Sequence, residues 1–173
     1  RRVTSSLVFL LQDVFDWQAI QEPAAEVARD TTGGLMTRGQ LVGRANRLAH
    51  ALLAAGLGRG DRVALLAKNC LDYPAVYLAC AKAGVTIVPL NYRLAPGEWS
   101  YILNDAGTKL VIARGDEYVA GIRGISDELK SVEQFVAMIP SNPIAAVAQG
   151  DLLGLIVFSL FFGIGIALVP SPA

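Results

Sequence analysis

Asn91-Tyr92-Arg93 is the polar cluster whose position best suits ligand binding, because it follows the apolar run Val85–Leu90. Such a run predicts a buried strand, and open α/β sheets bind ligands beyond the carboxyl ends of their strands. Two interpretations of the cluster remain open: packing within a loop, or contact of the Arg93 guanidinium with an anion. No residue in the sequence is assigned to cofactor binding.

Two glycine-rich segments invite comparison with phosphate-binding loops, but neither has the order that such a loop requires. Gly56–Asp61 follows a predicted helix and precedes a predicted strand, whereas a phosphate loop leads from a strand into a helix. Thr31–Gly34 is not followed by a lysine and has the composition of a hairpin turn. Both segments are therefore predicted to be turns.

The remaining reactive side chains do not form a catalytic or metal-binding pattern. His50 is the only histidine, and no serine or cysteine pattern accompanies it. Cys70 and Cys80 lie ten residues apart in a predicted helix, too far along its axis to form a disulfide. Asp116-Glu117 is interpreted as an acidic pair on the surface. We assign no catalytic residue, no metal site and no small-molecule substrate.

Charge divides the chain into two parts. The 173 residues include 15 Lys and Arg and 15 Asp and Glu, which argues against a dedicated nucleic-acid-binding protein. Every basic residue lies between Arg1 and Lys130, and only Glu133 and Asp151 are charged thereafter. A charge-balanced body is thus followed by an almost uncharged tail.

The body has the alternating pattern of an α/β protein. Thr37–Gln40 matches a capping box, and an apolar stripe with helical spacing follows it from Leu41 to Leu53. Further helices are predicted at Leu71–Ala83 and around Trp99–Ala106. Predicted strands are Arg62–Lys68, Val85–Leu90 and Lys109–Ala113, with a fourth at Val132–Met138 and a single helical turn at Asp127–Lys130. The order β-α-β-α-β predicts a partial parallel sheet with flanking helices.

Residues 1–35 are weakly patterned. They are expected to hold a short helix that ends near Gln21–Pro23 and a strand at Glu26–Arg29. After the turn at Thr31–Gly34, Leu35-Met36 is expected to return as the second strand of a hairpin.

Residues 139–151 form a Pro/Ala-rich loop, and Leu152–Val169 follows as 18 residues whose only polar side chain is Ser159. A helix of that length spans about 27 Å, close to the ~30 Å hydrocarbon core of a bilayer. The run predicts one C-terminal hydrophobic helix of transmembrane type, with a helix buried in a soluble core as the alternative. The chain is expected to be a cytoplasmic body with possible membrane association through this helix.

The body resembles the N-terminal subdomain of AMP-forming acyl-CoA synthetases, members of the adenylate-forming superfamily. The resemblance spans about residues 15–138, and residues 36–138 are interpreted as the synthetase-like N-terminal subdomain. The residues that carry it are Met36–Leu41, Arg44–Ala49, Gly56-Leu57, Gly60–Ala64, Ala83-Gly84, Val88–Leu94 and Tyr101–Ala106. It implies ATP, Mg²⁺ and coenzyme A for the complete enzyme. The Ser/Thr/Gly-rich loop ending in Lys-Gly and the other ATP-binding motifs of the family do not occur here, so the chain alone is expected to be an inactive fragment.

The tail resembles a different family, the dicarboxylate/amino-acid:cation symporters. Ile139–Pro143 and the run Val157–Ile164 carry this resemblance, which covers residues 139–169. A chimera joined at Met138–Ile139 is the simplest interpretation. A membrane-anchored or transporter-derived chain, and an inert α/β body with an aggregation-prone tail, are the alternatives to a synthetase fragment.

Overall fold

The computed structural model describes residues 10–138. Residues up to Val136 belong to one compact unit, and Ala137 and Met138 are the described start of a second unit that runs to Ala173. The predicted loop 139–151, the hydrophobic run Leu152–Val169 and the symporter-like segment lie outside the described residues. Within residues 10–138, no helix is long and apolar enough to cross a membrane.

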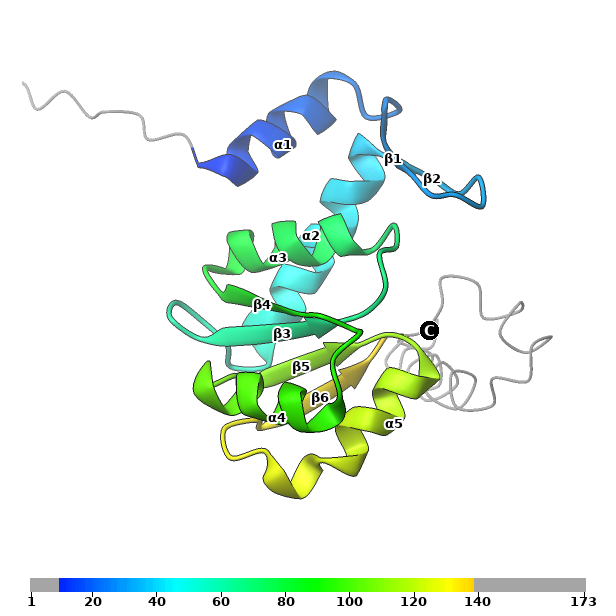
Figure 1. The fold of residues 1–173 in the computed structure, drawn as a ribbon. Helices are drawn as coiled ribbons and strands as arrows, with labels where there is room; N and C mark the ends of the chain where they lie inside the picture. The colour runs from blue at the N-terminus through cyan, green and yellow to red at the C-terminus, as the bar shows by residue number, and fades with distance from the viewer. Residues whose placement is uncertain (1–9, 139–173) are drawn as a thin grey trace, which may run out of the picture. The chain divides into compact units, whose positions relative to one another are not determined.

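A four-stranded sheet in the order β4-β3-β5-β6 forms the centre of the described unit (Figure 1). Its strands are β3 (Arg62–Leu66), β4 (Thr86–Leu90), β5 (Leu110–Ala113) and β6 (Gln134–Ala137). β3 is parallel to both β4 and β5, and Val63 lies opposite Ile87 on one side and Leu110 on the other. The predicted parallel sheet and its fourth strand are confirmed.

Helices cover both faces of this sheet. α2 (Arg38–Ala54) and α3 (Tyr73–Ala83) pack on one face, and α4 (Pro96–Asp105) and α5 (Asp116–Gly124) pack on the other (Figure 1). The connection from β3 to β4 moves one way across the sheet, and the connection from β4 to β5 moves back past β3. Because such crossovers are right-handed, this reversal places α3 and α4 on opposite faces.

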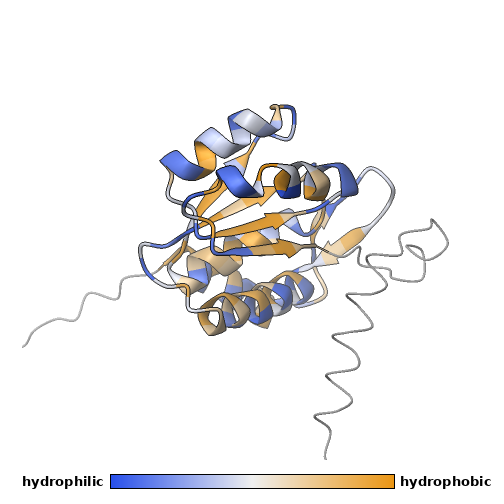
Figure 2. Ribbon diagram, turned by 90° about the horizontal axis from the view of Figure 1, so that it is seen from below, coloured by the Kyte–Doolittle hydropathy of each residue, from blue (hydrophilic) through white to orange (hydrophobic). Residues whose placement is uncertain are grey.

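The two central strands form the middle of the core. Val63 to Leu66 of β3 are completely shielded from solvent, and all four residues of β5 are buried. Strands covered on both faces are expected to be continuously apolar, and Figure 2 shows these strands as hydrophobic ribbons between the helices.

The first turn of α2 confirms the predicted capping box. The Thr37 hydroxyl oxygen accepts the Gln40 N–H at 3.3 Å, and the Gln40 side-chain oxygen accepts the Thr37 N–H at 3.0 Å. The buried face of α2 consists of Leu41, Ala45, Ala49 and Leu52. Leu53 was expected on this stripe but is half exposed, because twelve residues at 100° each rotate it about 120° from Leu41.

The elements predicted in residues 1–35 are also confirmed. α1 spans Leu11–Gln21, and β1 (Glu26–Arg29) pairs antiparallel with β2 (Leu35–Thr37). The Asp30 carboxylate organises the hairpin turn by accepting the N–H groups of Thr32 and Gly34. A hydrogen bond from the Thr32 hydroxyl, together with these backbone bonds, lowers the pKa of Asp30.

Two expectations after β5 need correction. The acidic pair Asp116-Glu117 is exposed as expected, but it also begins α5, a helix that the sequence analysis missed. The single turn expected at Asp127–Lys130 is a 3-10 helix at Ser126–Glu128. Both segments are short and rich in charge, so their apolar spacing is a weak signal until the sheet supplies a surface to cover.

The cap of α2 gives a first prediction. Replacement of Thr37 with Ala removes the acceptor for the Gln40 N–H and should lower the free energy of unfolding by about 1 kcal/mol, measured by urea denaturation. Thr37→Ser keeps the hydroxyl oxygen and is the matched control. Equal losses in the two variants would show that the cap does not stabilise the helix.

The contact between α4 and α5 gives a second prediction. A Cβ at Gly121 would lie 2.7 Å from Cζ3 of Trp99, which is buried. Gly121→Ala should therefore destabilise the chain by about 1–3 kcal/mol, because the Trp99 ring must shift. Gly43→Ala in α2 meets only ordinary contacts and should stabilise by about 0.5–1 kcal/mol. A stabilising effect of Gly121→Ala in urea denaturation would contradict this packing.

Candidate functional site

The candidate site lies where β3, β4 and β5 end. The chain leaves β3 toward α3 on one face and leaves β5 toward α5 on the other, so the connections diverge between these neighbouring strands. Divergence of this kind marks the place where open α/β sheets bind ligands. The side chains gathered here are Lys68 and Asp72 after β3, Asn91-Tyr92-Arg93 after β4, and Arg114, Glu117 and Tyr118 after β5.

Asp72 joins the two diverging connections. One oxygen of its carboxylate accepts a hydrogen bond from Nη1 of Arg44 at 2.6 Å, and the other accepts one from Nη1 of Arg114 at 3.1 Å. Asp72 is the N-cap residue of α3, but its side chain makes no capping bond. With both oxygens bound to arginines, Asp72 is a structural anion that ties α2 and the end of β5 to the start of α3.

Asn91 shapes the loop after β4. Its side-chain oxygen accepts the Arg93 N–H at 3.0 Å, and its backbone carbonyl accepts the indole N–H of Trp99 at 3.0 Å. The residue thereby fixes the turn and attaches it to α4. In the described structure, Asn91 participates in loop packing, the first of the two interpretations left open for this cluster.

Aromatic rings connect this loop to α5. Tyr118 is buried, and its ring meets Tyr92 edge-on at 6.2 Å and Trp99 at 6.1 Å between ring centroids. The Arg93 guanidinium lies 5.5 Å from the centroid of the Tyr92 ring, and the Lys68 ammonium lies 5.7 Å from that of Tyr118. Cation–π attraction therefore positions two exposed cations over the aromatic cluster.

The charges of this site are not balanced. The Glu117 carboxylate raises the pKa of Lys68 through a hydrogen bond of 3.3 Å. The backbone N–H of Glu117 lowers the pKa of its own carboxyl, and Lys68 lowers it further. Among the side chains gathered here, Lys68, Arg93, Arg114 and Arg44 are cations, whereas the ion pairs involve only the carboxylates of Asp72 and Glu117, which leaves an excess of positive charge in this cluster.

Other predicted features lie away from this edge. The segment Gly56–Asp61 forms the expected turn, in which the Asp61 carboxylate accepts the Gly58 N–H at 2.9 Å. His50 is exposed on α2. Within residues 10–138, no three or more His, Cys, Asp and Glu side chains are grouped to hold a metal ion.

Of the three strand ends that form the site, only the one after β4, at Asn91-Tyr92-Arg93, was predicted from the sequence. The rule that selected Asn91-Tyr92-Arg93 applies equally to Lys68 and Arg114, because each polar side chain stands just after an apolar strand. Asp72 and Tyr118 carried no comparable signal, because their partners at the site come from other segments of the chain.

Comparison with known proteins supports the synthetase resemblance. The family model described as AMP-binding enzyme matches residues 15–149. A fatty acid–acyl-carrier-protein ligase from Streptomyces coeruleorubidus is 38% identical over 117 residues, which are 68% of this chain and 20% of that protein. A long-chain-fatty-acid–CoA ligase from Mycobacterium tuberculosis is 38% identical over 121 residues, which are 69% and 23%. The chain thus spans about a fifth to a quarter of the length of these relatives.

Solved structures agree with the fold. A fatty acyl CoA synthetase from Mycobacterium tuberculosis aligns with a TM-score of 0.66 at 33% identity, over 73% of this chain and 26% of that one. The N-terminal domain of the FACL13 protein of the same organism aligns with a TM-score of 0.68 at 32% identity, over 75% and 34%.

The symporter alternative finds no support in these comparisons, and the family match itself continues eleven residues past the join predicted at Met138–Ile139. The matched family, the sequence identity and the aligned fold concern the same stretch of chain. This chain belongs to the family of AMP-binding enzymes.

Proposed function

We propose that this chain provides the N-terminal part of the α/β scaffold of an AMP-forming acyl-CoA or fatty-acid ligase. The observation that carries the proposal is the family match over residues 15–149. The names of the relatives suggest long-chain fatty acids as the substrate class. ATP, Mg²⁺ and coenzyme A would be the cofactors of the complete enzyme.

In the proposed reaction, a carboxylate oxygen attacks the α-phosphate of ATP, which releases pyrophosphate and leaves an acyl-adenylate. A thiol then takes the acyl group and AMP departs. The Ser/Thr/Gly-rich loop ending in Lys-Gly that the resemblance implies for ATP is not found in this sequence. The contribution of this chain is therefore scaffolding: β3 and β5, fixed by Asp72, would hold one wall of the nucleotide-binding domain.

The proposal is tested by exchanging segments. Residues 15–138 of this chain should replace the corresponding segment of the mycobacterial long-chain ligase, and pyrophosphate exchange should be measured with a panel of fatty acids. We expect the hybrid to form adenylates, because 38% identity over the aligned segment supports the same core. The chain by itself should give no exchange.

A second hybrid carrying Val63→Asp is the matched control, because it places a charge in a completely buried position of β3 and should abolish activity. A soluble, folded hybrid without pyrophosphate exchange would refute the scaffold role. Exchange by the chain alone would refute its dependence on the rest of the enzyme.

We also propose that Arg93, assisted by Lys68, contacts an anion at the strand ends. The excess of positive charge and the exposed position of both side chains support this. Arg93→Gln should weaken the binding of inorganic phosphate about fivefold, since an exposed ion pair contributes up to ~1 kcal/mol. Amide NMR shifts during a phosphate titration measure the affinity. Arg123 is an exposed arginine on α5 that is not part of the site, so Arg123→Gln should leave the phosphate affinity unchanged. Equal affinities in both variants would reassign the cluster to loop packing alone.

A further inference from the structure

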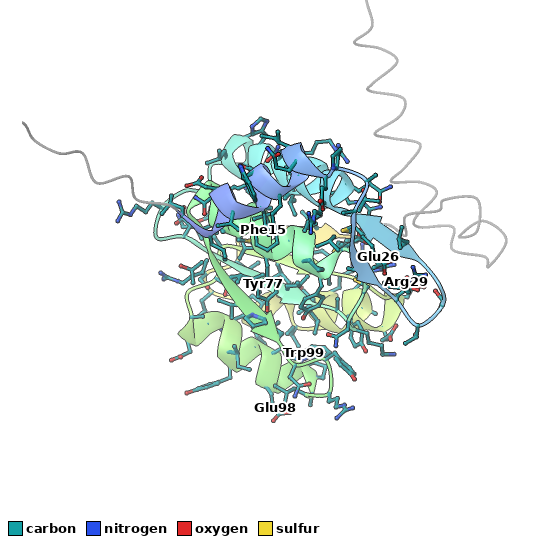
Figure 3. The ribbon with its side chains drawn as sticks, turned by 90° about the horizontal axis from the view of Figure 1, so that it is seen from above. Phe15, Glu26, Arg29, Tyr77, Glu98 and Trp99 are labelled. Atoms are coloured by element: carbon teal, nitrogen blue, oxygen red, sulfur yellow. The ribbon has the colours of Figure 1, made fainter. Side chains whose placement is uncertain are left out.

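The helix α1 lies against α2 and α3 but buries little of its own surface. None of its residues is fully buried, and the side chains of Trp17 and Ile20 are 62% and 76% exposed. A pocket of about 400 Å³ separates part of α1 from α3, and Figure 3 shows Phe15 and Tyr77, which line it, near one another. Because the packing is incomplete, burial of apolar surface stabilises this contact only weakly.

An ion pair ties the middle of α1 to α3. Both carboxylate oxygens of Asp16 lie 2.6 Å from Nζ of Lys82, and the Lys82 side chain is only 12% exposed. Water screens such a pair less than one on the open surface, so it stabilises the contact more than an exposed ion pair would. We call the Asp16–Lys82 pair the latch.

The C-terminal end of α1 is attached separately, to the first turn of α2. The Pro23 carbonyl oxygen accepts the Gly39 N–H at 2.9 Å. The Ala25 carbonyl oxygen accepts the Arg38 N–H at 2.9 Å, and the Glu22 carboxylate accepts Nη1 of Arg38 at 2.8 Å. Loss of the latch would therefore free α1 from α3 while residues 22–25 stay in place as a hinge.

Detachment of α1 would change the state of one buried thiol. Cys80 of α3 lines the pocket and is 1% exposed. Burial raises the pKa of the Cys80 thiol to about 11, so it holds very little of the reactive thiolate. A helix of eleven residues is marginal in water by itself, so α1 would unwind once it left α3 and would uncover this thiol.

We propose that α1 is a lid that opens over α3 by local unfolding, fastened by the latch and hinged at residues 22–25. The equilibrium between the closed and open states sets how much of the apolar surface of α3 meets solvent. The proposal concerns the motion of α1 alone and requires neither ATP nor the rest of a ligase. Its failure is therefore separate from any failure of the proposed scaffold role.

The test measures the reaction of Cys80 with an aromatic disulfide reagent in the full chain, with Cys70→Ser removing the other thiol. The Cys80 thiolate forms a disulfide with half of the reagent, and the other half leaves as a coloured thiolate that is measured. Asp16→Asn should raise the labelling rate about tenfold, as expected for loss of a charge-assisted hydrogen bond. Glu26→Gln breaks the ion pair with Arg29 on the hairpin, which Figure 3 also labels, and should leave the rate unchanged. Equal rates in the two variants would refute the latch.

A second latch variant keeps the test independent of an unpaired buried charge. Lys82→Met removes the ammonium but retains an apolar side chain, so α3 should remain folded while the labelling rate rises. Because both substitutions act on one ion pair, adding Asp16→Asn to Lys82→Met should raise the rate little further. Effects that multiply in the double variant would show that the two residues do not act together and would refute the latch.

Hydrogen exchange separates opening of the lid from unfolding of the whole unit. Amides within α1 should exchange through the same opening that exposes Cys80. The amides of Arg38 and Gly39 at the hinge, and of Val63 in β3, should exchange at least about tenfold more slowly. If the α1 amides exchange only as fast as that of Val63, or if Asp16→Asn and Lys82→Met accelerate Val63 equally, the lid does not open independently and the proposal is overturned.

Discussion

The double burial of β3 is the constraint on which the rest of the described structure depends. Its backbone pairs with β4 on one side and β5 on the other, and its side chains from Val63 to Leu66 are completely shielded from solvent. A strand placed in this way needs helices on both faces. The reversal of direction across β3, together with right-handed crossovers, supplies them by placing α3 and α4 on opposite sides.

The same reversal creates the polar edge of the sheet. Because the chain leaves β3 toward one face and β5 toward the other, backbone and side chains separate at the strand ends and leave polar groups there. Asp72 bridges this divergence through Arg44 and Arg114. The Tyr118 ring lies under the Lys68 ammonium, and the Tyr92 ring lies under the Arg93 guanidinium. The edge is thus fixed by an ion-pair bridge and an aromatic cluster rather than by a catalytic group.

The N-terminal helix α1 is attached to the rest of the unit in a different way. α1 rests against α2 and α3 without a fully buried residue, and a single ion pair between Asp16 and Lys82 spans 66 residues of sequence. An apolar pocket of about 400 Å³ lies between α1 and α3. The described unit therefore has a sheet that is covered on both faces and polar at one end, and an apolar flank at α1 that is less buried.

The sequence by itself determined the elements whose signals are local. The capping box at Thr37, the turn at Thr31–Gly34 and the apolar strands depend on residues a few positions apart. The family resemblance depends on short motifs in a fixed order, so all of these were readable without coordinates. The helix α5 was not predicted from the sequence, because its nine residues gain stability mainly from packing on the sheet.

Only the tertiary structure decided the strand order, the faces that the helices cover and the partners of Asp72, which lie 28 and 42 residues away. It also decided that Asn91 shapes its own loop and that a pocket opens beneath α1. These features depend on pairs of distant residues brought together by packing, and such pairing leaves no periodic trace in a single sequence.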